Sequence, residues 1–109
     1  MASEAKKTKT SKPFDAAKYL DSDEAVAEYI SEALLAGDID TITRAIGVAA
    51  RARGMSDIAR QTGLSRESLY KALSGEGHPQ FETITRVLQA LGLRLRAEPV
   101  DEPPKERAA

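Results

Sequence analysis

Apolar side chains recur at helical spacing along most of the chain, and glycines divide that pattern into segments. Four of the segments follow a residue that can cap a helix N-terminus: Asp21, Asp38, Ser56 and Ser65. The pattern predicts an all-α fold of five helices, which run over about 22–36, from Asp38 to near Gly54, over about 56–62, over about 66–74, and from Phe81 to Gly92.

Two features within these helices predict how they pack. Gly47 lies inside the second helix, where glycine costs about 1 kcal/mol relative to alanine, so we expect another helix to approach its backbone closely. Three aromatic residues, Tyr19, Tyr29 and Phe81, are expected in the core or as hydrophobic staples.

The chain changes its periodicity after Gly92. Residues 93–98 alternate apolar and charged side chains, which is typical of a β-strand, with Leu93, Leu95 and Ala97 on one face. A single strand cannot satisfy its own backbone groups. We therefore expect this strand to pair with a second chain or with an element that the pattern does not reveal.

The third and fourth predicted helices form the most informative motif. Ala59 and Gly63 lie four residues apart, which suits a helix-turn-helix unit with a small residue at the helix crossing and glycine in the turn. The second helix of this unit then exposes a polar, partly cationic face: Ser65, Arg66, Glu67, Tyr70, Lys71 and Ser74. Such a face suits the major groove of DNA, whereas the alternative is an ordinary solvated helix.

Composition excludes several classes of function. The 109 residues suffice for one small domain, and with no cysteine and one histidine the chain has neither thiolate chemistry nor a multi-histidine metal site. His78 is interpreted as a loop residue. No apolar run reaches the length of a membrane span, and no signal peptide is recognisable. We expect a cytoplasmic protein that is not an enzyme and needs no cofactor, metal or small-molecule substrate.

The net charge of −1 conceals a segregation along the chain. Residues 13–40 carry eight acidic side chains against one lysine, whereas residues 41–79 carry six basic side chains against three acidic ones. Opposite charge on successive segments predicts two surfaces with two different partners. Residues 1–12 are predicted to be a disordered basic tail and 99–109 a second disordered tail, which leaves a folded domain over 13–98.

The helix-turn-helix segment resembles a known family. The similarity is carried by Met55-Ser-Asp-Ile-Ala-Arg-Gln-Thr-Gly-Leu-Ser-Arg-Glu-Ser-Leu-Tyr-Lys-Ala-Leu, by His78-Pro79 and by Leu91-Gly92. These residues resemble the Xre/Cro-like (lambda-repressor-like) helix-turn-helix proteins. Phe14-Asp-Ala-Ala-Lys-Tyr-Leu, the acidic helix with Ala-Leu-Leu-Ala-Gly-Asp, and Leu69-Tyr-Lys-Ala-Leu-Ser make the chain similar to one branch, the addiction-module antidote proteins (HigA-like antitoxins).

This resemblance implies a function with two partners. It implies the antitoxin of a type II toxin–antitoxin module, which neutralises a RelE/HigB-like toxin and binds operator DNA as a homodimer to repress its own operon. One alternative is a stand-alone or phage-type Xre-family regulator without a toxin. Another is a protein-binding module that no longer contacts DNA. The implied fold is a five-helix domain with a short C-terminal strand.

Candidate residues follow for each partner. The DNA-binding candidates are Ser56, Ser65, Arg66, Glu67, Ser68, Tyr70, Lys71, Ser74 and Arg44. Arg51 and Arg53 are either phosphate contacts beside Arg44 or part of a solvated face. The toxin-binding candidates Glu24, Glu28 and Glu32 form one acidic stripe, whose alternative is again a solvated face. The strand at 93–98 is expected to pair with its own copy in the dimer or with a toxin sheet.

Overall fold

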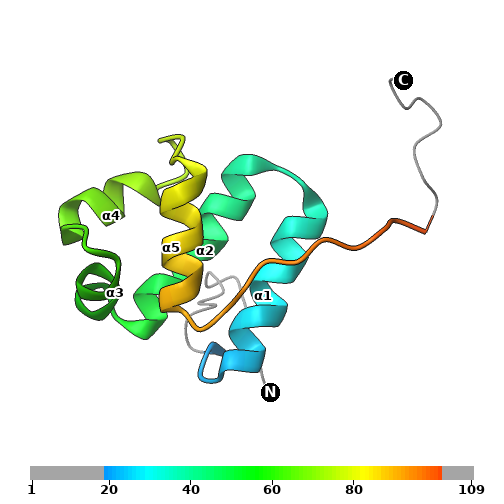
Figure 1. Cartoon of the computed structure of the whole chain (residues 1–109), viewed down its shortest axis with the longest axis horizontal. Coiled ribbons are helices and arrows are strands. Elements are labelled where there is room, and N and C mark those ends of the chain that lie inside the picture. Colours follow the sequence, from blue (N-terminus) through cyan, green and yellow to red (C-terminus); the bar gives the residue numbers. More distant parts are fainter. Residues whose placement is uncertain (1–18, 102–109) are drawn as a thin grey trace, which may run out of the picture.

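The computed structural model describes residues 19–101, and this part of the chain contains five α-helices (Figure 1). They are α1 (Asp23–Ala36), α2 (Ile39–Arg53), α3 (Met55–Thr62), α4 (Arg66–Ala72) and α5 (Phe81–Ala90). The predicted all-α class and the five helices are confirmed. The predicted tail at 1–12 and residues 102–109 of the second tail lie outside the described residues.

Local chemistry explains where the helices begin. The Asp38 carboxylate accepts from the backbone N–H of Thr41 at 3.0 Å, and Ser65 Oγ accepts from that of Ser68 at 3.0 Å, so both predicted caps are confirmed. The other two predicted caps are wrong by one or two residues. Ser22 caps α1 in place of Asp21, and Gly54 precedes α3 in place of Ser56.

The α2 helix lies at the centre of the fold. The α1 helix packs on one part of it, and α3 and α5 pack on the rest, with α4 resting on α3 (Figure 1). The largest fully buried side chains come from four of the helices and the turn after α5: Ile46, Ile58, Leu69, Val87 and Leu91. No helix in the part of the chain that the structure describes is long and apolar enough to cross a membrane.

Gly47 sits at the tightest approach to α2. A Cβ atom at this position would lie only 2.8 Å from the carbonyl oxygen of Leu73 and 3.3 Å from its Cβ. Leu73 is the C-cap of α4, so glycine allows the end of α4 to rest directly on α2. The expected close packing at Gly47 is confirmed.

The predicted C-terminal strand is wrong for this chain on its own. Residues 93–100 form no strand within the described part, and their path runs from the end of α5 across α1 (Figure 1). The backbone N–H of Leu93 still bonds to the carbonyl of Leu88 at 2.9 Å. After Leu93, the segment has no partner strand among the described residues with which to form backbone hydrogen bonds. The alternation of apolar and charged side chains therefore produces no sheet.

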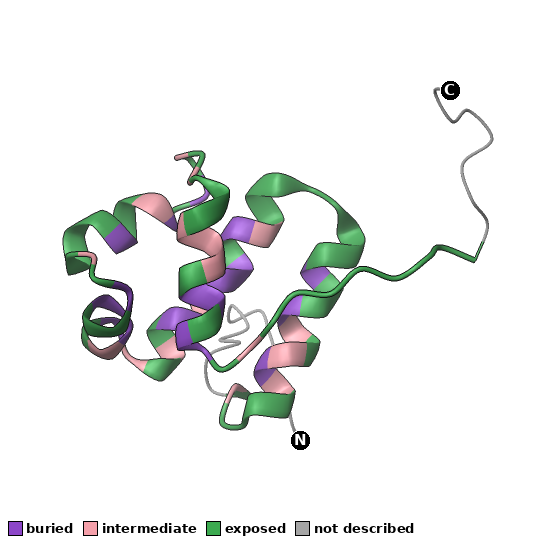
Figure 2. Cartoon of the chain, viewed as in Figure 1, coloured by how far each residue is buried: buried purple, intermediate pink, exposed green. Residues whose placement is uncertain are grey.

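Two further predictions are wrong: one concerns aromatic residues that lie at the surface (Figure 2), and the other concerns the end of α4. Phe81 and Tyr19, expected in the core or as staples, are 71% and 64% exposed, whereas Tyr29 is half-buried against the core.

The α4 helix ends at Ala72 and not at 74, because Leu73 leaves the helical path and points into the core.

Candidate functional site

The turn between α3 and α4 is built around Gly63. This residue has φ +78°, a conformation that side chains disfavour, and its N–H bonds to the carbonyl of Ala59 at 2.9 Å. Leu64 N–H bonds to the same carbonyl at 3.2 Å. The buried hydroxyl of Thr62 donates to that carbonyl as well, so three donors fix the angle at which the chain enters α4. The predicted roles of Ala59 and Gly63 in the turn fit this geometry.

The α4 helix fully buries one residue, half-buries Ala72 and exposes the other five. Leu69 is fully buried, whereas five of the predicted DNA-binding residues on this helix are exposed: Arg66, Glu67, Ser68, Tyr70 and Lys71. Neither Arg66 nor Lys71 takes part in an ion pair among the described residues. Both cations therefore remain available to an anionic partner.

Arg66 and Tyr70 interact along the helix. The guanidinium carbon of Arg66 lies 5.9 Å from the centroid of the Tyr70 ring, at the outer limit of a cation–π contact. The two residues are one turn apart, so the ring holds the guanidinium on the outward side of α4. Both side chains are exposed, so this contact lies on the face of α4 that is open to a partner.

The serines at this site have mainly local roles. Ser65 Oγ caps α4 and also bonds to Ser68 Oγ at 3.0 Å. Ser74 Oγ donates to the carbonyl of Lys71 at 3.1 Å and accepts from Glu76 N–H at 3.2 Å, which shapes the loop after α4. Ser56 lies exposed in the first turn of α3.

Arg44 of α2 reaches the loop that follows α4. A Cβ atom at Gly75 would lie 2.6 Å from Nε and 2.7 Å from Cγ of Arg44, so the arginine side chain lies flat against this glycine. Gly75 also has φ +90°, so both its conformation and its neighbour require glycine. The structure thus brings Arg44 next to the C-terminal end of α4. The prediction that Arg44 and the α4 residues contact the same DNA requires this proximity.

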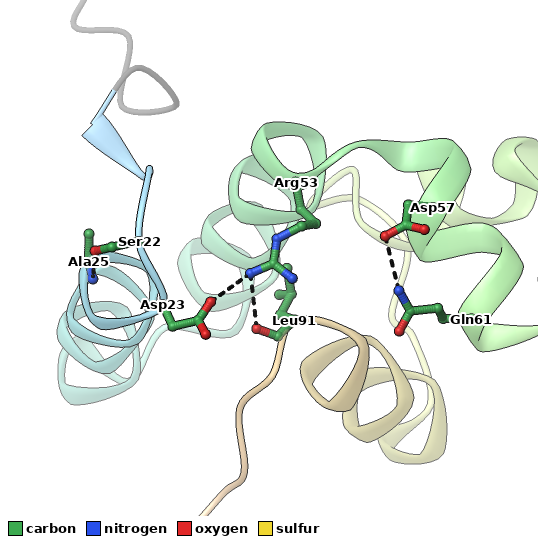
Figure 3. Close-up of polar contacts among 7 residues, drawn as sticks. All are labelled: Ser22, Asp23, Ala25, Arg53, Asp57, Gln61 and Leu91. Atoms are coloured by element: carbon green, nitrogen blue, oxygen red, sulfur yellow. Dashed lines mark hydrogen bonds and ion pairs between the residues drawn. The ribbon is translucent and has the colours of Figure 1, made fainter.

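Arg53 has a different role from the other α2 arginines (Figure 3). Its Nη2 atom lies 2.9 Å from Oδ1 of Asp23 and 3.3 Å from the carbonyl oxygen of Leu91. It thereby connects α1, α2 and the end of α5. This geometry does not support the alternative in which Arg53 contacts phosphates. Sequence reasoning missed this contact because the partners are 30 and 38 residues away.

The α3 helix contributes little free positive charge. Asp57 forms an ion pair with Arg60 and accepts a hydrogen bond from Gln61 at 3.0 Å (Figure 3 shows the Gln61 bond). Both partners of Asp57 follow it within about one turn of the same helix. The carboxylate thus neutralises the one basic side chain of α3.

The acidic stripe lies on the outer face of α1. Glu24, Glu28 and Glu32 are all exposed, and none forms an ion pair among the described residues. On α5, by contrast, Glu82 pairs with Arg86 at 2.8 Å. The stripe therefore presents uncompensated negative charge on a helix that is remote in the fold from α4 (Figure 1).

The charged residues that the structure describes lack the cluster that a metal site requires. Within the described residues, no cluster of three or more histidine, cysteine, aspartate or glutamate side chains could hold an ion. The hydrogen bonds from Thr41, helped by the charge of Arg44, lower the pKa of Asp38. That shift reflects the helix cap.

Comparison with known proteins points to one family. A family model described as "Probable addiction module antidote protein" matches residues 10–99 of this chain. A protein of Haemophilus influenzae (strain ATCC 51907 / DSM 11121 / KW20 / Rd), described as uncharacterized, is 47% identical over 91 residues, which cover 84% of this chain and 94% of the relative. No solved structure matches the chain with statistical significance.

Proposed function

The chain belongs to the family of probable addiction module antidote proteins, and from this membership we propose that it is the antitoxin of a type II module. In this proposal it neutralises a RelE/HigB-like toxin and represses its own operon as a dimer bound to operator DNA. The observation that carries the DNA-binding part is the exposed polar and cationic face of α4, held by the turn at Gly63. Proteins of this kind act by binding, and typically not by catalysis.

The proposed DNA contact uses α4 as the recognition helix. Arg66 suits a guanine edge, because its guanidinium can donate two hydrogen bonds to O6 and N7. Glu67 can accept from cytosine, and Tyr70 can pack on the backbone or on a thymine methyl. Lys71 and Ser65 suit phosphates, and Arg44 extends this basic surface at the loop after α4. Ser56, Ser68 and Ser74 remain weaker candidates for phosphate contacts.

The proposed toxin contact uses the other charged surface. A RelE-like toxin that acts on RNA is expected to be basic, and the stripe of Glu24, Glu28 and Glu32 offers unpaired carboxylates on α1. Opposite charges on the two proteins would increase the association rate and favour this orientation. Because the stripe lies on α1 and the proposed DNA contact on α4, one chain can serve both partners.

The proposed dimer involves the segment at 93–98. Leu93 is half-buried on the core of its own chain, whereas Leu95 and Ala97 are exposed on the segment that runs out from α5 (Figure 1). Such a segment can pair with its copy across a two-fold axis. Two-fold dimers of this class read half-sites about 34 Å apart, which one recognition helix cannot do alone.

One experiment separates the proposal from its alternative. The chain is co-expressed with the neighbouring reading frame, tested for copurification, and footprinted on its own upstream DNA. The proposal expects a stable complex with a small basic protein and protection of a palindromic site. Protection without any protein complex would indicate a stand-alone regulator, and a complex without protection would indicate a purely protein-binding module.

A further inference from the structure

An apolar groove of about 280 Å³ lies between α1, α2 and α5, away from the outward face of α4. Its walls include Leu34 of α1, Ile39 and Ile42 of α2, Phe81 and Ile84 of α5, and Leu95 of the C-terminal segment. Eight large hydrophobic side chains are exposed in the described part of the chain, and four of them border this groove. Single exposed apolar residues are normal on a protein surface, whereas a cluster of them marks an interaction surface.

We propose that this groove binds a second copy of the same chain, with Phe81 of each copy inserted into the groove of the other. The inference rests on the dimer of the proposed function and assigns the residues that hold it. Phe81 is 71% exposed and yet borders the groove, so one surface carries both a protruding ring and a recess for it. A two-fold interface requires this kind of self-complementary patch.

Charge around the groove also fits a second copy. Ile39 is flanked in sequence by Asp38 and Asp40, whereas Leu95 is flanked by Arg94 and Arg96, and all four charged residues are exposed. The chain next to one lining residue of the groove is thus acidic, and the chain next to another is basic. A two-fold arrangement can set the acidic segment around Ile39 of one copy against the basic segment around Leu95 of the other, which favours self-association over binding of a uniformly basic protein.

The position of the groove suits the proposed DNA contact. Phe81 is the first residue of α5, and only the loop at 73–80 separates it from α4. Docking through Phe81 therefore places the interface one short loop away from each α4 helix. The groove also includes Leu95, so the same contact brings the two C-terminal segments together.

A small apolar ligand fits the groove less well. Its volume lies near the lower end of small-molecule sites, about 300 Å³, and such sites have several converging polar groups. Here the polar lining residues are His78 and Thr43, and Thr43 is itself buried. The groove thus has little to orient a ligand, whereas an aromatic side chain on a folded partner is oriented by the rest of the interface.

The first test measures the mass of the full chain by light scattering and its dimer dissociation constant by sedimentation. The variant Phe81→Glu is expected to weaken the dimer by about tenfold or more, because it puts a charge into the apolar recess. Leu35→Glu is the matched control, since Leu35 is 81% exposed on α1 and does not line the groove. Circular dichroism confirms that both variants fold.

The second test uses the absence of native cysteine. A chain with Phe81→Cys is mixed with a chain with Ile39→Cys, and a disulfide between the two is expected, whereas Phe81→Cys mixed with Leu35→Cys is expected to give none. An unchanged dimer in Phe81→Glu together with no Phe81–Ile39 crosslink would overturn the inference, as would a monomeric wild-type chain. Operator footprinting of the wild-type chain is a separate readout, so loss of this contact and failure of the proposed function remain distinguishable.

Discussion

The guanidinium of Arg53 lies 2.9 Å from the carboxylate of Asp23, which joins the end of α2 to the beginning of α1. The same nitrogen also donates to the carbonyl of Leu91 at 3.3 Å. One side chain thus holds three parts of the fold together. The α1 helix carries the proposed toxin surface, so this contact also fixes that surface relative to the rest of the protein.

Replacing Arg53 with alanine is expected to lower the free energy of unfolding by about 1 kcal/mol. The ion pair is partly exposed and contributes modestly, but the carbonyl of Leu91 also loses its donor. Urea denaturation measures the effect. Arg86→Ala is the control, because its exposed pair with Glu82 is expected to contribute only about 0.3–0.5 kcal/mol. An equal loss in both variants would contradict the special role of Arg53.

Replacing Gly47 with alanine tests the close approach of α4 to α2. Alanine has the higher helix propensity by about 1 kcal/mol, so an open position would be stabilised. Here the new Cβ would meet the Leu73 carbonyl oxygen at 2.8 Å, and backbone must move to accommodate it. We expect a net loss of about 1–3 kcal/mol in denaturant unfolding, which is the usual cost of overpacking. A gain in stability would show that α4 can shift without cost.

Local sequence signals account for much of the fold. Each helix combines an apolar stripe with a cap or a glycine stop, and such signals act within a few residues, so the five helices could be predicted. The predicted cap at Ser56 is wrong because this serine lies inside the first turn of a helix that already begins at Met55. The close packing at Gly47 could be predicted because glycine destabilises the interior of a helix and is favoured there where a neighbour needs the space.

The remaining features depend on contacts distant in sequence. Arg53 has the same side chain as its neighbours Arg44 and Arg51, and only the folded chain brings Asp23 to it. The alternation at 93–98 describes one half of a strand pair, and the described part of this chain lacks the other half. Phe81 falls on the apolar stripe of its helix, but burial requires a covering element, which the described chain does not supply.

Replacing Asp38 with asparagine tests the helix cap through its pH dependence. The hydrogen bonds from Thr41 lower the pKa of Asp38 in the folded state, so the ionised carboxylate stabilises the fold above the ordinary pKa of about 4, and this stabilisation is lost as the pH falls through the lowered value. Asparagine keeps the accepting oxygen without the charge. We expect a lower Tm than wild type at pH 7 and a smaller difference below about pH 4. Glu98→Gln controls for the loss of one negative charge outside the helices.

Replacing Arg66 or Lys71 with alanine tests the proposed recognition helix. Arg66→Ala is expected to cost about 1–3 kcal/mol of operator affinity and to relax the sequence preference at one base pair. Lys71→Ala is expected to weaken binding to all sequences and to reduce the slope of log K against log salt by about one. Fluorescence anisotropy at several salt concentrations distinguishes the two effects. Arg86→Ala is the control, and a change of less than about 0.5 kcal/mol for Arg66→Ala would argue against a base contact.

Reversing the charge of the α1 stripe tests the second surface. The triple variant Glu24→Lys, Glu28→Lys and Glu32→Lys is expected to weaken toxin binding by about tenfold or more, mainly through a slower association rate. The triple glutamine variant removes the negative charge without adding repulsion, so its effect is expected to be smaller. Surface plasmon resonance at low and high salt measures both, and the difference from wild type should shrink as salt screens the charges. Operator affinity is measured on the same preparations. Loss of toxin and DNA binding together would indicate misfolding, and unchanged toxin binding would show that α1 is a solvated face.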